Sequence, residues 1–304
     1  MSDLERLMAF LARQPDLTGA PIAERRAAYD KAEKAFALPE GVTVAPSNPG
    51  GVASDLIKVR DAIDGRKILY LHGGGYAIGS TRSHRHLAAA IGVAARADVV
   101  LPDYRLAPEH AFPAAVDDAL AVYRAILGGA APDRLVVAGD SAGGGLTVAT
   151  LLAARAAGHA LPAAAVCLSP WVDLNCAPDS LVAQAAAGDP LVNLDDITLY
   201  ARAYLGKTPV DNPLASPIFG DLGGLPPLLI HASASEALVS DSTRLAEAAR
   251  KAGVDVTLEL TDGTPHVWHW FWPRLDLARD SIKRIGAFLD RHLVHGDRGR
   301  QAVA

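Results

Sequence analysis

The chain has 304 residues, half of them hydrophobic, which suffices for one large domain with an insertion or for two domains. The formal net charge is −5 and the basic residues are scattered, which argues against nucleic acid or another polyanion as a partner. The two cysteines give no disulfide framework, and no stretch reaches the length of a transmembrane helix. No signal peptide is recognisable, so we expect a soluble cytoplasmic protein.

Two helices are predicted before any strand. Residues 2–13 place leucines on one helical face, and after a break a second amphipathic helix extends to about residue 37. Because no strand precedes them, these helices must pack their apolar faces on later parts of the chain.

A sheet is predicted from Val42 onward. The first three strands, at 42–45, 55–60 and 67–71, are joined by turns too short for crossover helices, so we expect an antiparallel edge. Strands and helices then alternate. The further strands are predicted at 99–101, 135–138, 164–168, 228–232 and 256–260, and the helices at 114–127, 144–157, 242–252 and 274–293. This pattern predicts an α/β fold whose eight-stranded, mostly parallel sheet is covered on both faces.

The stretch between Ser169 and Leu228 is much longer than a crossover needs, and it contains a helical segment near 195–205. With the N-terminal helices, it is predicted to form a cap over the carboxyl ends of the strands, where open α/β sheets bind ligands. The expected division is N-terminal cap helices at 1–40, a catalytic domain at 41–180 and 215–295, a cap insertion at 181–214 and a frayed tail at 296–304.

The central motif is Gly-Asp-Ser-Ala-Gly at 139–143, between a predicted strand and a predicted helix. Small residues alone could pack a helix tightly on a sheet. The strand–turn–helix context, however, is the one in which Gly-x-Ser-x-Gly presents a nucleophilic serine, here Ser141. The turn also leaves the first helix amides unpaired and directed at whatever the serine attacks.

Three glycines follow another predicted strand, in His72-Gly-Gly-Gly-Tyr76. They let the backbone approach a ligand closely and present successive amides, which indicates an oxyanion site. A phosphate-binding loop would need a lysine and a serine or threonine next, and the sequence has neither there. We interpret His72 as an anchor of this loop.

The catalytic base is expected in the loop after the last strand. His266 is favoured there, and His269, which stands among tryptophans, is the alternative. The acid is expected after the strand at 228–232, where Glu236 is favoured because it is nearer the strand end. Asp241 remains the alternative, although it also suits the start of a helix.

The order Ser141, Glu236, His266 is that of α/β-hydrolases. The sequence resembles the hormone-sensitive-lipase-like group of this superfamily, the bacterial family IV esterases, over residues from about 66 to 293. The stretches that carry the resemblance are HGGG at 72–75, GDSAGG at 139–144, PH at 265–266, DYRLAPEH at 103–110 and SPW at 169–171. The group usually has an aspartate as the acid, and this sequence departs from it with Glu236.

The resemblance implies an α/β-hydrolase fold with a helical cap and a serine carboxylesterase that acts on short-chain acyl esters through an acyl-enzyme. Ser141 would attack the ester carbonyl, His266 would take its proton and Glu236 would orient the imidazole. Amides of Gly73, Gly74 and Ala142 would bind the oxyanion. A lactone, carbamate or aryl-amide hydrolase on the same triad stays an alternative, as does a non-catalytic small-molecule receptor.

Some other polar residues are interpreted as structural rather than as part of a binding or catalytic site. His84 and His86 have no third ligand nearby, so no metal and no cofactor are predicted. Asp140 is interpreted as structural, and Asp103, Tyr104, Arg105 and Glu109 as a buried polar network behind the site. By resemblance, a homodimer through the last strand and helix, about 255–293, is possible.

Overall fold

The computed structural model describes residues 1–176 and 189–294, and it contains one eight-stranded sheet in the order β1-β2-β4-β3-β5-β6-β7-β8. The strands are β1 (Val42–Ser47), β2 (Ser54–Val59), β3 (Lys67–Leu71), β4 (Asp98–Pro102), β5 (Leu135–Asp140), β6 (Ala164–Leu168), β7 (Leu228–Ser233) and β8 (Val256–Thr261). The neighbours from β4 to β8 in this order are parallel. The predicted α/β fold with a mostly parallel sheet is confirmed.

The predicted antiparallel edge is correct for β1 and β2, which pair with each other, and β2 also pairs antiparallel with β4. The prediction is wrong for β3, which is parallel to both of its neighbours, β4 and β5. The physical reason is the helix α4 (Thr81–Ala95), which the sequence analysis does not predict. It carries the chain from β3 across to β4, and such a crossover makes the two strands parallel.

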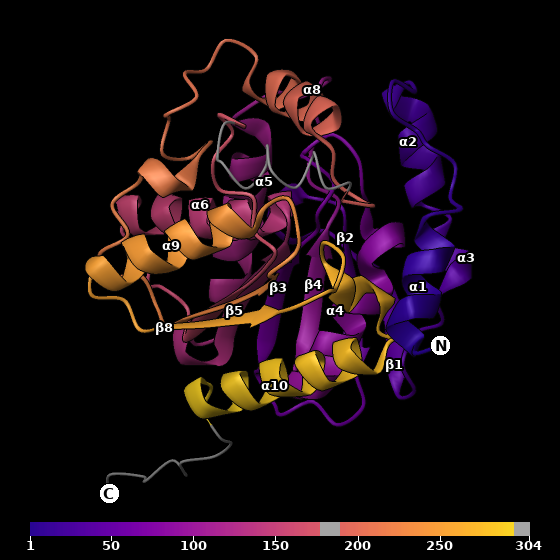
Figure 1. The fold of residues 1–304 in the computed structure, drawn as a ribbon. Coiled ribbons are helices and arrows are strands. Elements are labelled where there is room, and N and C mark those ends of the chain that lie inside the picture. The colour runs from indigo at the N-terminus through magenta and orange to yellow at the C-terminus, as the bar shows by residue number, and fades with distance from the viewer. Residues whose placement is uncertain (177–188, 295–304) are drawn as a thin grey trace, which may run out of the picture.

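Helices cover both faces of the sheet, with α4 and α10 on one face and α5, α6 and α9 on the other (Figure 1). The helices not yet bounded are α1 (Asp3–Leu11), α2 (Ile22–Tyr29), α3 (Ala32–Ala35), α5 (Ala114–Leu127), α6 (Ala142–Ala156), α8 (Leu194–Leu205), α9 (Val239–Lys251) and α10 (Asp276–His292). None of the helices in these two stretches of chain has the length and apolar character needed to cross a membrane.

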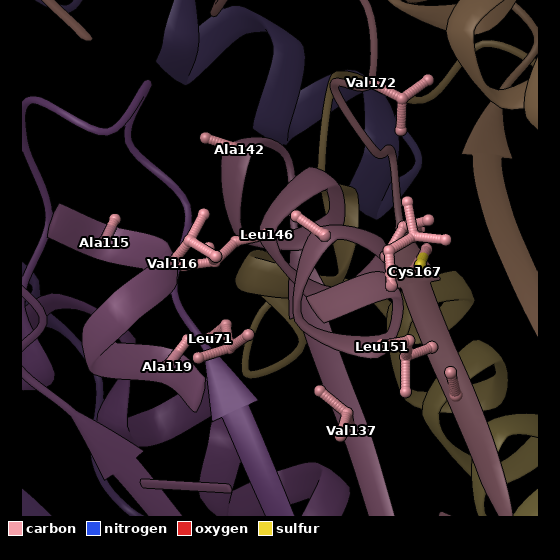
Figure 2. Packing of buried hydrophobic residues seen from close by; sticks show 14 of the residues in the cluster. Leu71, Ala115, Val116, Ala119, Val137, Ala142, Leu146, Leu151, Cys167 and Val172 are labelled. Carbon is pink, nitrogen blue, oxygen red and sulfur yellow. The ribbon is translucent and has the colours of Figure 1, made fainter. Parts of the chain in front are cut away.

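The sheet separates two apolar cores, because successive strand residues point to opposite faces. Val136 and Ile68 belong to the core on the α4 and α10 side. Val137 and Leu71 belong to the other core, where they and Leu146 fill the space between the sheet and helices α5 and α6 (Figure 2). This packing fixes β3 and β5 side by side, and the candidate site is built on the residues that follow them.

The N-terminal helices pack on later segments, as expected from their position before the sheet. Leu7 and Leu11 of α1 join a small core with Trp268 and Phe271. The single long helix predicted up to residue 37 is instead two, α2 and α3, separated by Asp30 and Lys31. The proposed division into cap and catalytic parts stays a prediction. Part of the insertion, 181–188, and the tail at 296–304 lie outside the described residues.

Candidate active site

Ser141 stands on a sharp turn between β5 and α6. Its backbone has φ 52° and ψ −121°, a region that residues with a side chain rarely adopt. The flanking glycines make the turn possible, since a Cβ on Gly143 would lie 2.0 Å from the Leu71 carbonyl oxygen. A Cβ on Gly139 would lie 2.3 Å from the Gly143 carbonyl oxygen. The half-buried serine is therefore held in a strained turn pressed against the end of β3.

The glycine loop after β3 lies directly against this turn. A Cβ on Gly73 would come within 2.2 Å of Asp140 Oδ2. Gly74 has φ +114°, and a Cβ there would lie 2.2 Å from the Ile78 carbonyl oxygen. The amides of Gly73, Gly74 and Ala142 donate no hydrogen bond to any residue of 1–176 or 189–294. Amides of a glycine loop and of a helix start that are left unpaired can stabilise an oxyanion.

A buried polar cluster supports the loop from behind. Asp140 is buried, accepts a hydrogen bond from the Tyr70 hydroxyl at 2.8 Å and lies 3.4 Å from Nε2 of His84. Burial alone would raise the pKa of Asp140, but His84 and the Tyr70 hydroxyl stabilise the carboxylate and the pKa is lowered. This arrangement agrees with the interpretation of Asp140 as structural.

His72 anchors the loop as interpreted from the sequence. Its Nδ1 donates to the Gly73 carbonyl oxygen at 2.8 Å, and its ring stacks on Tyr104 with 4.2 Å between the ring centroids. Burial, with His84 nearby, lowers the pKa of His72 to about 3, so the ring is neutral at pH 7.

Glu236 and His266 meet beyond the ends of β7 and β8. His266 Nδ1 lies 3.5 Å from Glu236 Oε2, and the Glu236 side chain is fully buried. The same carboxylate oxygen accepts a hydrogen bond from the Ser169 hydroxyl at 2.7 Å and one from the Ser233 amide at 3.3 Å. The carboxylate is thus fixed from two directions while it faces the imidazole.

Ser169 also links these residues to Ser141. The Ser141 amide donates to the carbonyl oxygen of Leu168, the residue before Ser169, at 2.8 Å. The Ser169 hydroxyl oxygen accepts from the Val267 amide, next to His266, at 3.2 Å. From the sequence alone, Ser169 stands only in a motif of the family and has no evident role, because its contacts join the ends of strands that are distant in the sequence.

The protonation behaviour of His266 is set by opposing influences. Burial would lower its pKa, but the charge and hydrogen bonding of Glu236, together with the charges of Asp189 and Asp140, outweigh burial, and the pKa of His266 is raised. Its Nε2 atom is buried and has no hydrogen-bond partner within the described part of the chain. A buried imidazole nitrogen without a protein partner can exchange a proton with a bound reactant.

The two alternative site residues lie elsewhere. Asp241 Oδ2 accepts the amides of Val172 and Asp173 at 2.8 and 3.0 Å, and burial raises the pKa of Asp241 to about 7. His269 is buried beside His231 and Ser281, with its Nε2 2.8 Å from the serine hydroxyl. Burial, with His231 nearby, lowers the pKa of His269 well below its usual value. The geometry favours Glu236 and His266 over both.

Two further expectations concern residues outside this cluster. His84 and His86 point to different partners, since His86 Nε2 donates to the Trp270 carbonyl oxygen at 2.8 Å. Among residues 1–176 and 189–294, no group of three His, Cys, Asp or Glu side chains could hold a metal ion.

The predicted buried network of Asp103, Tyr104, Arg105 and Glu109 is wrong for the three charged residues, which are exposed. Tyr104 is buried as predicted, and its hydroxyl donates to the His72 carbonyl oxygen at 2.7 Å. Arg105 instead pairs with Asp118 and Glu109 with Arg26, each at 2.7 Å. The Arg26–Glu109 pair lies at the surface, where the charges stay hydrated. Arg105 is exposed as well and reaches inward to a buried partner, Asp118.

Comparison with known proteins gives consistent results. A family model described as the alpha/beta hydrolase fold matches residues 68–270. An acetyl-hydrolase from Streptomyces hygroscopicus is 48% identical over 272 residues, covering 88% of this chain and 89% of that protein. An esterase from Acinetobacter venetianus is 30% identical over 93% of this chain and 94% of that protein.

A solved structure is similar along almost the whole chain. It is the crystal structure of an esterase from the bacterial hormone-sensitive lipase family, with 41% sequence identity and a TM-score of 0.91. The match covers 97% of this chain and 100% of that one. The resemblance found in the sequence is thereby confirmed, and the chain belongs to the α/β-hydrolase fold family and, within it, to the hormone-sensitive-lipase-like esterases.

Proposed function

We propose that this carboxylic ester hydrolase is a serine carboxylesterase that cleaves short-chain acyl esters through an acyl-enzyme on Ser141. The observation that carries the proposal is the pairing of His266 Nδ1 with the buried Glu236 carboxylate at the sheet end where Ser141 occupies a strained turn. The nucleophile, the base and the acid follow three different parallel strands, whose carboxyl ends gather at one edge.

In the first half-reaction, Ser141 Oγ attacks the ester carbonyl carbon and its proton passes to His266 Nε2. The imidazolium that forms is stabilised by the Glu236 carboxylate, 3.5 Å from Nδ1. The negative charge that develops on the carbonyl oxygen is met by the unpaired amides of Gly73, Gly74 and Ala142. The C–O bond then breaks, and His266 returns the proton to the leaving alcohol.

In the second half-reaction, His266 takes a proton from water as the water oxygen attacks the acyl-Ser141 carbonyl. The same amides stabilise the second tetrahedral intermediate. Collapse of that intermediate breaks the bond to Ser141 Oγ, which regains a proton from His266, and the carboxylic acid is released. Bonds and protons balance with water as the only co-reactant.

The preference for short acyl chains is proposed from the aromatic side chains near the glycine loop. Tyr76, which follows Gly75, stacks on Tyr204 of α8 with 3.8 Å between the ring centroids. Trp171 also lies near Tyr76, with 6.2 Å between the centroids. We propose that residues 1–40 and 181–214 act as a cap, which together with these aromatic side chains limits the length of the acyl chain.

The test is hydrolysis of p-nitrophenyl esters from acetate to long acyl chains, by the wild type and by Ser141→Ala. We expect turnover that is fastest on short chains and falls by at least about a thousandfold in the variant. Folded wild-type protein with no activity on any of these esters would contradict the carboxylesterase proposal and direct attention to lactones, carbamates and aryl amides. Full activity in Ser141→Ala would contradict the role of the serine.

A further inference from the structure

The third glycine of the loop after β3 supports an aromatic ring. A Cβ on Gly75 would lie 2.5 Å from Cδ2 of Tyr200, so the Tyr200 ring occupies the space that a side chain would need. Tyr200 belongs to α8, more than a hundred residues further along the chain. The ring therefore lies directly on the backbone whose preceding amides, those of Gly73 and Gly74, are proposed to bind the oxyanion.

Arg25 of α2 holds this ring in place. Its Nη1 donates to the Tyr200 hydroxyl at 2.9 Å, and its guanidinium lies 5.5 Å from the ring centroid. Nη1 also lies 2.8 Å from Oδ1 of Asp196, which stands one helical turn before Tyr200 on the same face of α8. Arg25 Nε donates to the Ala20 carbonyl oxygen at 2.9 Å, which ties the guanidinium to its own segment.

The burial of Arg25 is unusual for a short surface helix. It is the one residue of α2 that is buried, with 3% of its surface exposed, whereas helices usually bury an apolar stripe. A buried guanidinium is costly unless it is paired, and removing one partner of a buried ion pair is strongly destabilising. The helix therefore docks on α8 through a charged contact rather than through apolar packing.

The next residue of α2 binds the far end of the same loop. Arg26 Nε donates to the Ala77 carbonyl oxygen at 2.8 Å, and its Nη2 donates to the Ala107 carbonyl oxygen at 2.8 Å. Both arginines thus constrain the segment from Gly75 to Ala77, Arg25 through Tyr200 and Arg26 directly. Figure 1 shows α2 and α8 at the same end of the molecule.

We infer that Arg25 is a positioning residue for the oxyanion loop. By binding Asp196 and Tyr200 it keeps the tyrosine ring on Gly75, and the ring fixes the amides of Gly73 and Gly74 where the oxyanion forms. The inference rests on the proposed function, since it assigns those amides to catalysis. A displacement of about 1 Å in catalytic groups can cost on the order of a hundredfold in rate, so a loop without this support loses turnover rather than substrate affinity.

The experiment compares Arg25→Met, Tyr200→Ala and Tyr200→Phe with the wild type in the full chain. The matched control is Arg202→Met, which removes an exposed arginine from the same helix α8. For each protein, kcat and KM are measured on p-nitrophenyl butyrate, with thermal unfolding to verify the fold. Hydrogen–deuterium exchange of residues 72–78 measures the order of the loop without requiring enzyme activity. The amides of Ala77 and Ile78 donate to the Gly74 carbonyl oxygen, so their exchange slows when the loop is ordered.

We expect kcat to fall by about tenfold to a hundredfold in Arg25→Met and Tyr200→Ala, with KM within about threefold of the wild type. Tyr200→Phe loses the hydrogen bond from Arg25 but keeps the ring and its contact with the guanidinium, so it should retain most of kcat. Arg202→Met should behave as the wild type. Exchange over 72–78 should be faster in the first two variants alone.

Either of two results would overturn the inference. One is unchanged exchange over 72–78 in Arg25→Met and Tyr200→Ala, which counts even if the wild type hydrolyses no ester. The other is a change in kinetics of the wrong kind: a loss of kcat that Tyr200→Phe shares in full with Tyr200→Ala, or an increase in KM with kcat unchanged in Arg25→Met. A wild type inactive on all esters, with faster loop exchange in the variants, would instead contradict the proposed function while retaining the positioning of the loop.

Discussion

His266 Nδ1 lies 3.5 Å from Glu236 Oε2, and the carboxylate is held for this contact by the hydroxyl of Ser169 and the amide of Ser233. At this separation the contact is longer than a short hydrogen bond, and the Glu236 charge acts on the imidazole across it. The contact joins the loops after β7 and β8 and accounts for the raised pKa of His266.

Glu236→Gln should lower kcat by about a hundredfold to ten-thousandfold, because a neutral amide does not stabilise the imidazolium or select its tautomer. Steady-state kinetics on a short p-nitrophenyl ester measure the loss. The matched variant is Asp241→Asn, which removes the rival carboxylate. Since Asp241 accepts two backbone amides, this variant should lose about 1–3 kcal/mol in the free energy of unfolding and keep most of its turnover. The opposite pattern would assign the acid to Asp241.

The activity should rise with pH on the acid side of the profile. His266 must be neutral to accept the serine proton, and Glu236 raises its pKa above 6.5, so the rise in kcat/KM should have its midpoint above that value. In Glu236→Gln the charge that raises the pKa is gone while burial, which lowers it, remains. The midpoint of the residual activity should therefore move to lower pH, and profiles between about pH 5 and 9 measure both values. A midpoint that does not differ between the two proteins would contradict the pairing.

Gly73→Ala should abolish most of the activity, because the new Cβ would lie 2.2 Å from Asp140 Oδ2 and force the loop away from Ser141. We expect kcat to fall by at least about a hundredfold, the usual effect of losing an oxyanion donor. Gly128→Ala is the control, since Gly128 is exposed and the nearest atom to its missing Cβ is 3.4 Å away. If Gly73→Ala turned over at the rate of this control, the loop would have no role in catalysis.

Asp140→Asn should destabilise the fold by about 1–3 kcal/mol at pH 7, since it removes a buried carboxylate that accepts the Tyr70 hydroxyl. The pKa of Asp140 is lower in the folded state than the ordinary 3.8. The stabilisation of the fold by the ionised Asp140 carboxylate is therefore complete above the ordinary pKa of 3.8, and it is lost as the pH falls through the lower pKa of the folded state.

Urea unfolding at several pH values should accordingly show a gap between wild type and Asp140→Asn that narrows at acid pH. Asp280→Asn, at an exposed pair with Lys283, is the control and should change stability little. A gap between wild type and Asp140→Asn that widened as the pH fell would contradict the account of Asp140.

Local patterns in the sequence were enough to predict the motif-bearing parts of the site. The turn at Ser141 and the glycine loop at Gly73 each follow from a few consecutive residues, and short apolar runs indicated β5 and β7. The strand order was not predictable in the same way, because the pairing of β2 with β4 depends on segments far apart. Helix α4 was missed because polar side chains, among them His84 and His86, lie on its buried side and obscure the helical pattern.

The residues that support the site from a distance were likewise not predictable from local patterns in the sequence. Ser169 acquires its role only where the ends of β6, β7 and β8 meet, and a lone serine in a loop carries no signal for this. Arg25 and Tyr200 stand 175 positions apart. From the sequence alone, an arginine in a polar N-terminal helix would be expected at the solvent-exposed surface. Their contact depends on the packing of α2 against α8, which periodicity does not specify.

The most direct test of the central claim is to trap the acyl-enzyme. The wild type and Ser141→Ala are mixed with p-nitrophenyl acetate, quenched in acid within one turnover, digested and examined by mass spectrometry. The account predicts one acetyl group on the wild-type peptide that contains Ser141, and none on the corresponding peptide of the variant. An acetyl group on a different residue that turns over at the steady-state rate, or hydrolysis by Ser141→Ala as fast as by the wild type, would contradict it.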